Sequence, residues 1–209
     1  MKTRTLLQLN SSLNSTAGHS SRLADAFVAN WRAANPGADV MVRDLAADPV
    51  PHLTAERFGA FLSKPEERTA EQRAVLEYSD GLIDELKAAD VIVLGLPLYN
   101  FGVPSTLKAY FDHIARAGVT FRYTESGALG LLTGKKAYVL AARGGIYAGT
   151  PQDTQTAYVR GFLAFLGITD VEFVYAEGLA IGEATRESAL TKAREQIEAL
   201  TATEWKQAA

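Results

Sequence analysis

The sequence predicts an α/β protein with a doubly wound parallel sheet of five strands and helices on both faces of the sheet. Short runs rich in β-branched and other apolar residues alternate with longer segments of helical periodicity along the 209 residues, an order typical of parallel sheets. The run Val91-Ile92-Val93-Leu94 is apolar without interruption, as expected for a central strand buried on both faces. A chain of this length suits a single domain over residues 1–209.

The first two strands are expected at residues 6–9 and 40–42, on either side of a helix at residues 20–35. Serines at the start of this helix are good N-cap residues, and Asn35-Pro36-Gly37 is a sequence that stops a helix. The segment at residues 51–65 lacks a clear period. We expect it to be irregular, with a single helical turn.

The middle of the chain contains the third strand between two helices. Ser105 is expected to cap the helix after the strand, and Gly118 to end it. In the helix before the strand, which starts near Thr69, the apolar residues fall on one face. These residues are Val75, Leu76, Leu82, Ile83 and Leu86.

Two further strands and two helices complete the pattern. The strands are expected at residues 137–142 and 171–175, and the helices at residues 158–166 and 184–204. Ligands of such sheets bind beyond the carboxyl ends of the strands, where the direction of winding reverses. The loops after strands one, three and four are therefore the places where we expect chemistry.

Composition excludes several classes of function. The net charge of -3 and the lack of a basic block disfavour nucleic acid as a partner. The absence of cysteine removes disulfides, thiolate metal sites and a cysteine nucleophile. No apolar stretch is long enough for a membrane span, and the N-terminal residues do not have the pattern of a signal peptide. We therefore expect a cytoplasmic protein without a metal site and without membrane contact.

The loop after strand one, residues 10–21, is rich in Ser, Asn and Gly and leads directly into a helix. Hydroxyls and free backbone N–H groups at a helix N-terminus form an anion site. Neither a P-loop nor a Gly-x-Gly-x-x-Gly motif is present, so a single terminal phosphate fits better than a pyrophosphate. The alternative is a loop that is only well capped. His19 is either a donor to such a phosphate or an ordinary exposed histidine.

The loops after strands three and four suit a flat aromatic ring. Residues 95–104 combine Pro and Gly with Leu98, Tyr99, Asn100 and Phe101, which offer apolar surface and one amide. A planar isoalloxazine needs such contacts, although the same loop would also pack on its own domain. In residues 142–147 the paired glycines allow close backbone approach and expose N–H donors for a reduced flavin. A plain Gly-Gly turn is the alternative there.

Several segments, taken in order, resemble the FMN-dependent NADH:quinone reductases, also called azoreductases, over essentially the whole chain. The matching segments are Arg43-Asp44-Leu45-Ala46, Pro97-Leu98-Tyr99-Asn100-Phe101, Ala117-Gly118-Val119-Thr120-Phe121-Arg122-Tyr123-Thr124, Arg143-Gly144-Gly145-Ile146 and Phe165-Leu166-Gly167-Ile168.

The resemblance implies a flavodoxin-like fold and a homodimer with one FMN per subunit near the interface. It also implies a ping-pong cycle in which NADH or NADPH reduces the flavin, and a quinone or an azo compound then takes two electrons in the same pocket. The flavin carries the chemistry, so no catalytic side chain is expected. The residues that match the family's cofactor positions are Ser12, Gly18, His19, Ser20, Leu98, Tyr99, Asn100, Phe101, Ala142, Arg143, Gly144 and Gly145.

The chain departs from the family at two cofactor positions. Many relatives have a hydroxyl residue in place of Gly18 and a serine in place of Ala142, so Ser11, Ser15 and Thr16 are candidates to supply the missing donors. The resemblance also implies that Phe121, Arg122 and Tyr123 belong to the acceptor pocket, contributed across the dimer, although a buried aromatic run is more often packing.

Two other readings remain open. A flavodoxin that only carries electrons between proteins would share the fold, but such carriers are usually more acidic than this chain. A phospho-acceptor receiver domain has a similar topology, but it needs acidic residues near the end of strand one, and residues 6–15 contain neither Asp nor Glu. His113 is expected to be an ordinary packed or surface histidine.

Overall fold

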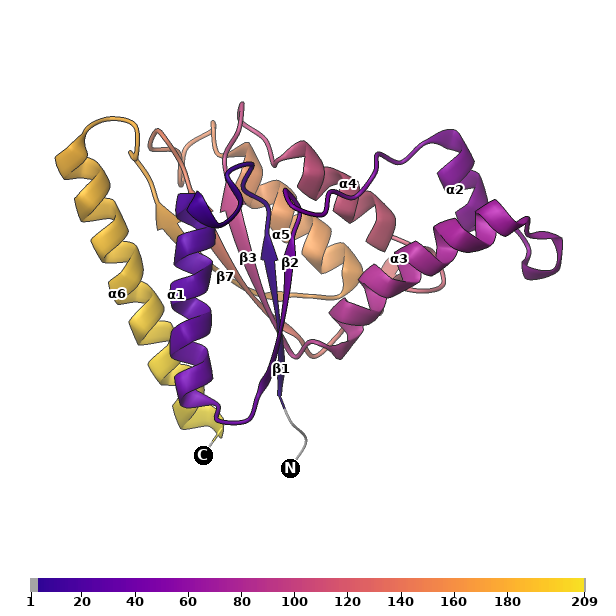
Figure 1. The fold of residues 1–209 in the computed structure, drawn as a ribbon, viewed down its shortest axis with the longest axis horizontal. Helices are drawn as coiled ribbons and strands as arrows, with labels where there is room; N and C mark the ends of the chain where they lie inside the picture. The colour runs from indigo at the N-terminus through magenta and orange to yellow at the C-terminus, as the bar shows by residue number, and fades with distance from the viewer. Residues whose placement is uncertain (1–3, 209) are drawn as a thin grey trace.

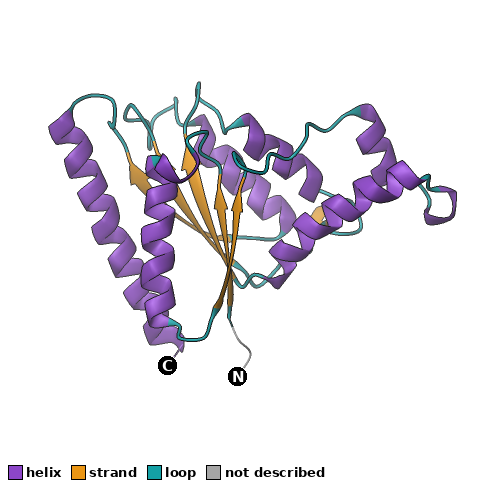
Figure 2. Cartoon of the chain, viewed as in Figure 1, coloured by secondary structure: helices purple, strands orange, loops and turns teal. Residues whose placement is uncertain are grey.

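A computed structural model describes residues 4–208 and shows a twisted, fully parallel five-stranded sheet in the order β2-β1-β3-β6-β7. Helices cover both faces of this sheet (Figures 1 and 2). The predicted fold class is therefore confirmed. The strands are β1 (Thr5–Asn10), β2 (Asp39–Asp44), β3 (Val91–Pro97), β6 (Lys136–Ala142) and β7 (Asp170–Ala176).

Two apolar cores lie on opposite faces of the sheet. Helices α1 (His19–Ala34) and α6 (Glu183–Ala208) pack side by side on one face (Figure 1). There Phe27 packs on Tyr138 with a ring-centroid distance of 4.4 Å. The helices α3 (Ala70–Ala88), α4 (Ser105–Ile114) and α5 (Thr154–Leu166) cover the other face. Both layers explain why every residue of β3 is buried, as its continuous apolar run predicts.

The winding of the sheet reverses between β1 and β3. From β1 the chain crosses to β2 at one edge, whereas β3 is followed in the sheet by β6 and β7 toward the other edge. In the register, Asn10 of β1 lies opposite Gly95 of β3 and Asp44 of β2, so these carboxyl ends meet at one rim. The loops after β1 and β3 diverge there, which leaves room for a ligand.

Two stretches of secondary structure differ from the sequence prediction. Residues 51–65, expected to be irregular, contain the two-turn helix α2 (Ala55–Leu62), which Thr54 caps by accepting a hydrogen bond from the Arg57 N–H. The sequence pattern also missed an antiparallel hairpin of β4 (Phe121–Thr124) and β5 (Gly127–Gly130). Its strands are too short for a clear two-residue period to appear.

Three predicted helix ends are wrong. Gly18, not a serine, occupies the N-cap of α1, and no side chain caps that helix. Pro104 is the N-cap of α4, so Ser105 is its first helical residue rather than its cap. Helix α4 ends at Ile114, before Gly118. Local propensity fails at these ends because proline can also precede a helix and because tertiary contacts decide where the last turn stops.

Among residues 4–208, no helix has both the length and the apolar character needed to cross a lipid bilayer.

Candidate functional site

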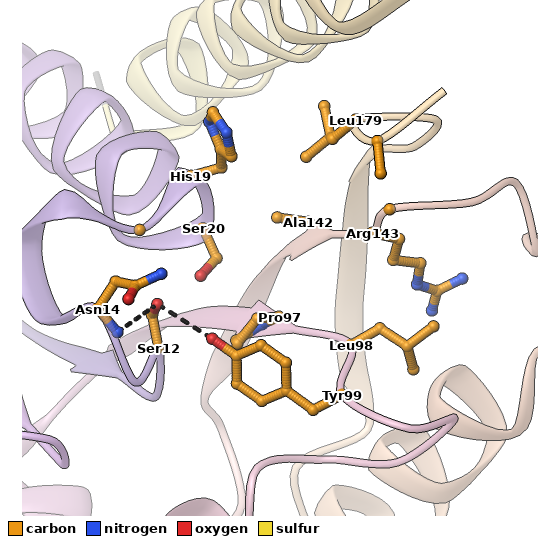
Figure 3. Close-up of a pocket in the computed structure, with 13 residues that line it drawn as sticks. Ser12, Asn14, His19, Ser20, Pro97, Leu98, Tyr99, Ala142, Arg143 and Leu179 are labelled. Atoms are coloured by element: carbon orange, nitrogen blue, oxygen red, sulfur yellow. Dashed lines mark hydrogen bonds between the residues drawn. The ribbon is translucent and has the colours of Figure 1, made fainter. Parts of the chain in front are cut away.

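A pocket of about 260 Å³ opens at the rim where the winding reverses; we call it the rim pocket. It lies between the loops that follow β1, β3, β6 and β7 (Figure 3). Its lining residues are Ser12, Asn14, Gly18, His19, Ser20, Pro97, Leu98, Tyr99, Ala142, Arg143, Gly144, Leu179 and Ala180.

The first turn of α1 brings unused hydrogen-bond donors to this pocket. The N-cap residue Gly18 has no side chain to offer, and no hydrogen bond among residues 4–208 uses the N–H groups of His19, Ser20 or Ser21. The hydroxyl of Ser20 is buried and has no partner, and Figure 3 shows it directed into the pocket. Unpaired buried polar groups are costly. This turn is therefore arranged for an anionic ligand that would accept these hydrogen bonds.

Gly95 allows the first turn of α1 to approach the sheet this closely. A Cβ atom at this position would lie 3.1 Å from the carbonyl oxygen of Ser20 and 3.2 Å from Oδ1 of Asn10. Both distances are tighter than ordinary van der Waals contact, and the backbone oxygen has little freedom to move. The glycine at the rim end of β3 therefore helps to place the donors of α1 beside the loop after β3.

Ser12 and Tyr99 connect the loops after β1 and β3. The hydroxyl of Tyr99 lies 3.4 Å from Oγ of Ser12 and accepts a hydrogen bond of 3.3 Å from the N–H of Leu13. Oγ of Ser12 also accepts a 3.2 Å hydrogen bond from the N–H of Asn14 (Figure 3). A Cβ atom at Gly18 would lie 2.2 Å from this Oγ. A side chain at position 18 would therefore require Ser12 to turn away.

Two of the three hydroxyls considered as replacements are already used elsewhere. Ser11 donates to the carbonyl of Gly95 at 2.8 Å, and the hydroxyl of Ser15 donates to the carboxylate of Asp44. The idea that these two serines supply the missing phosphate donors is therefore wrong for this conformation. Ser20 supplies the free hydroxyl instead.

His19 lies half-buried beside two cations. Burial lowers the pKa of its imidazole, and the charges of Arg22 and Arg186 lower it further. The ring is consequently neutral near pH 7 and retains one N–H donor. The same positive surroundings favour an anion in the pocket.

The loop after β3 contains a tight turn at residues 99–102. The N–H of Tyr99 donates to the carbonyl of Gly102 at 3.2 Å, and the N–H of Gly102 donates to the carbonyl of Tyr99 at 2.9 Å. Both central residues have positive φ angles, 49° at Asn100 and 60° at Phe101. Both are exposed, and neither lines the rim pocket. Leu98 and Tyr99 do line it, and their contact with a flavin stays a prediction.

The loop after β6 offers backbone donors rather than a charged side chain. No hydrogen bond among residues 4–208 uses the N–H groups of Gly144 or Gly145. Figure 3 shows the guanidinium of Arg143 directed away from the pocket. It is fully buried, with ion pairs of 2.9 Å to Asp153 and 3.1 Å to Glu177. Position 143 therefore contributes only its backbone to the pocket, while its side chain supports the loop from behind.

This buried network fixes the glycine loop. Oε1 of Glu177 accepts hydrogen bonds of 2.9 Å from the N–H groups of both Tyr147 and Ala148. Burial opposes ionisation of Asp153, but hydrogen bonds from Arg143 and Thr156 outweigh it and hold the pKa of this carboxyl below its usual value. The carboxylate of Asp153 thus remains charged beside Arg143, and the loop is held in a defined shape.

The sequence prediction missed part of this arrangement. The pocket lining includes Asn14, Leu179 and Ala180, which were not predicted, and does not include Gly145. Leu179 and Ala180 follow β7, whose rim end was not considered although it lies beside β6. Tyr123 is exposed on the hairpin, and Phe121 packs against Phe165 with a centroid distance of 4.3 Å.

The two hairpin aromatics do not line the rim pocket of their own chain. Their predicted role across a dimer stays a prediction. Within residues 4–208, no group of three or more His, Cys, Asp or Glu side chains is arranged to hold a metal ion.

Comparisons with known proteins agree with this geometry. The chain matches the family model described as "Flavodoxin-like fold" over residues 4–201. It is 58% identical over 194 residues to the FMN-dependent NADH:quinone oxidoreductase of Cellvibrio japonicus, a match that covers 93% of this chain and 96% of the relative. It is 56% identical to a protein of the same name from Burkholderia pseudomallei, over 94% of this chain and 99% of the relative.

Solved structures resemble the fold over nearly the full length. A Bacillus anthracis FMN-dependent NADH-azoreductase in complex with FMN has a TM-score of 0.87 and 29% identity, covering 96% of this chain and 98% of that chain. An NAD(P)H:quinone oxidoreductase from Methanothermobacter marburgensis has a TM-score of 0.69 at 20% identity, a likeness of fold alone.

Proposed function

Because the chain belongs to the flavodoxin-like family of FMN-dependent NADH:quinone oxidoreductases, we propose that it is an enzyme that binds FMN in the rim pocket and uses NADH to reduce quinones. We propose further that it cleaves aromatic azo compounds, accepts NADPH as an alternative donor and follows a ping-pong cycle. The relatives are named for quinone and azo substrates, which supports this choice of acceptors.

One observation carries the proposal. The buried Ser20 hydroxyl has no partner and lies at a helix N-terminus without a side-chain cap, where the N–H groups of the first turn are free. A terminal phosphate supplies acceptors for all of these donors at once, and the helix dipole favours its charge. The residues present thus fit the phosphate of FMN, with Ser12 and His19 beside it.

The remaining walls fit a flat ring. Leu98, Pro97 and Leu179 offer apolar surface, and the free N–H group of Gly144 is a donor for the polar edge of the ring. The free N–H group of Gly145 lies next to it, outside the lining. We propose Tyr99 as the opposite edge, with Ala142 and the backbone of Arg143 beneath. Asn100 and Phe101 lie outside the lining of the single chain, and we propose that they approach the ring from the neighbouring turn.

When bound, FMN supplies the hydride chemistry, accepting a hydride from the nicotinamide and giving two electrons to the acceptor. The chain positions both partners and supplies fixed N–H dipoles at the glycine loop, which favour negative charge on the reduced ring. No side chain has to transfer a proton to the substrate or form a covalent bond with it. Loose acceptor specificity follows, since any flat acceptor that stacks on the same surface qualifies.

We also propose that the protein is a homodimer with one FMN per subunit, that residues 1–209 form one flavodoxin-like domain and that the protein is cytoplasmic. An apolar groove of about 550 Å³ beside the rim pocket, lined by residues that include Phe101, Val103 and Tyr158, supports the dimer. Phe101 and Tyr158 are 55% and 38% exposed in the single chain. Light scattering coupled to gel filtration would measure the mass, and a monomer would contradict this part.

The decisive experiment follows NADH oxidation by the purified, FMN-loaded protein with benzoquinone as acceptor. We expect FMN to copurify or bind in a 1:1 ratio and NADH to be consumed well above the background of free FMN. Bound flavin without NADH oxidation would favour a non-enzymatic electron carrier. A colourless protein that takes up no FMN would overturn the proposal altogether.

A further inference from the structure

The turn at residues 99–102 has an unfavourable sequence for its shape. A two-residue turn with positive φ at both central positions favours Asn-Gly, because glycine has no Cβ to clash. Here the second central residue is Phe101, at φ 60°. Its side chain is 55% exposed, so burial of the ring does not compensate for this conformation. Other contacts must hold the turn.

The N-terminus of α5 provides these contacts. The side-chain amide of Gln155 donates from Nε2 to the carbonyl of Pro97 at 2.9 Å and to the carbonyl of Gly102 at 3.2 Å. One amide group thereby joins the backbone on both sides of the turn. The hydroxyl of the neighbouring Thr154 donates to the carbonyl of Phe101 itself.

Gln155 is an unexpected residue for packing alone. It is 1% exposed, and its Oε1 is buried without a hydrogen-bond partner. Burying an unpaired amide oxygen is unfavourable, and an apolar side chain of similar size would avoid it. The position therefore retains its amide for the two hydrogen bonds that Nε2 donates to the turn.

We propose that Gln155 and Thr154 are positioning residues that hold the 99–102 turn in its strained shape and thereby set the affinity and reduction potential of bound FMN. This inference rests on the proposed function. No hydrogen bond among residues 4–208 uses the N–H groups of Asn100 or Phe101. Gln155 and Thr154, which we call the clamp, therefore fix where these two free donors lie, next to Tyr99 of the rim pocket. Donors held in place stabilise the more negative, reduced form of a flavin more than the oxidised form.

The experiment compares FMN affinity, by fluorescence quenching, and the midpoint potential of bound FMN in the wild type and in Gln155→Leu. We expect the dissociation constant to rise about tenfold, the loss expected from two hydrogen bonds of ordinary strength, and the potential to become more negative. Thr154→Ala, at an exposed position, should change both quantities in the same direction by less. It also keeps the test valid if Gln155→Leu does not fold.

A second variant background separates the effect of the clamp on FMN binding from an effect on the stability of the whole fold. Phe101→Gly removes the conformational strain at the turn, so adding Gln155→Leu to it should raise the dissociation constant only about twofold. The matched control is Val159→Ala, one turn along α5 and fully buried in the core. It should lower the melting temperature while leaving FMN affinity and potential unchanged.

Three results would overturn the inference. The first is wild-type affinity and potential in both Gln155→Leu and Thr154→Ala. The second is an equally large loss from Gln155→Leu in the Phe101→Gly background. The third is the same loss of affinity from Val159→Ala. Failure of the wild type to bind FMN is a different result, since it removes the proposed function before any variant is made.

Discussion

The rim pocket and the cluster around His113 differ in how their polar side chains are hydrogen-bonded. This cluster consists of Arg57, Ser79, His113 and Arg116, and we call it the His113 cluster. Nε2 of His113 accepts from Nε of Arg57 at 3.1 Å, and its Nδ1 lies 2.9 Å from the carbonyl of Ala109. The N–H on Nδ1 therefore donates to that carbonyl, and both ring nitrogens are used.

The serine of this cluster is equally well satisfied. Ser79 donates to the carbonyl of His113 at 2.6 Å and accepts from Nη1 of Arg116 at 3.1 Å. At the rim, by contrast, the hydroxyl of Ser20 is just as buried and has no partner. Complete pairing indicates a structural role, whereas unpaired donors that converge on a pocket indicate a missing ligand. The comparison thus separates two histidines and two serines that look alike in the sequence.

The largest expected effect comes from filling the rim pocket. Ala142 lines this pocket and is 8% exposed, and Ala142→Leu adds a branched apolar group where we place the flavin. We expect FMN affinity to fall on the order of 100-fold, about 2.7 kcal/mol, with little change in stability. Titration of FMN fluorescence measures the loss. Ala74→Leu, the same change on the exposed face of α3, should have no effect on binding.

Removing the hydroxyl of Ser79 should affect stability and not binding. Ser79→Ala leaves the carbonyl of His113 and a guanidinium N–H of Arg116 without a buried partner. We expect the free energy of unfolding to fall by about 1–3 kcal/mol, as measured by urea denaturation. Unchanged stability would show that full pairing in the His113 cluster does not stabilise the fold. It would contradict the structural role that we assign to this cluster.

The same substitution at Ser20 should affect FMN binding and not stability. Its hydroxyl has no partner in the free protein, so Ser20→Ala should leave the free energy of unfolding unchanged or slightly higher. FMN affinity should fall about tenfold, because one hydrogen bond to a charged phosphate is lost. A destabilised Ser20→Ala that binds FMN normally would show that the pairing pattern does not identify a ligand site.

The sequence predicted the sheet and the position of the pocket better than the details of either. The five strands follow from apolar runs and from the alternation with helices, and the rim follows from the topology rule. Helix α2 escaped prediction because Gly59 interrupts its short apolar pattern, although Thr54 is a valid cap. The first turn of α1 was predicted to be capped by serines, and its importance lies instead in the absence of a cap.

Site residues were identified as positions in loops, which could not reveal side-chain direction. Arg143 is adjacent to the paired glycines in sequence, yet its guanidinium is buried behind them by ion pairs with Asp153 and Glu177, which lie 10 and 34 residues further along the chain. Gln155 was not singled out at all. Its role depends on a contact with backbone carbonyls more than fifty residues away, at Pro97 and Gly102, and no local pattern encodes such a contact.

The smallest expected effect concerns pH, and it also distinguishes the two histidines. Burial lowers the pKa of His113, the hydrogen bond to Ala109 partly opposes this, and Arg57 lowers the pKa further. The unfolded chain then binds a proton more readily than the fold does. Stability from this group is complete above about pH 6.5 and is lost as the pH falls toward the lowered pKa. FMN affinity should not follow this change.

For His19 we expect the reverse, since its titration should change FMN affinity and not stability. Its pKa is lowered by burial and by two arginines in the free protein, and a bound phosphate beside it would raise that pKa. The complex would then take up protons, so FMN affinity should increase by about two- to threefold between pH 7.5 and pH 6.5. His19→Gln should flatten this dependence while leaving acid stability unchanged. A pH profile unaffected by His19→Gln would place the phosphate away from the imidazole and limit the anion site to the backbone and Ser20.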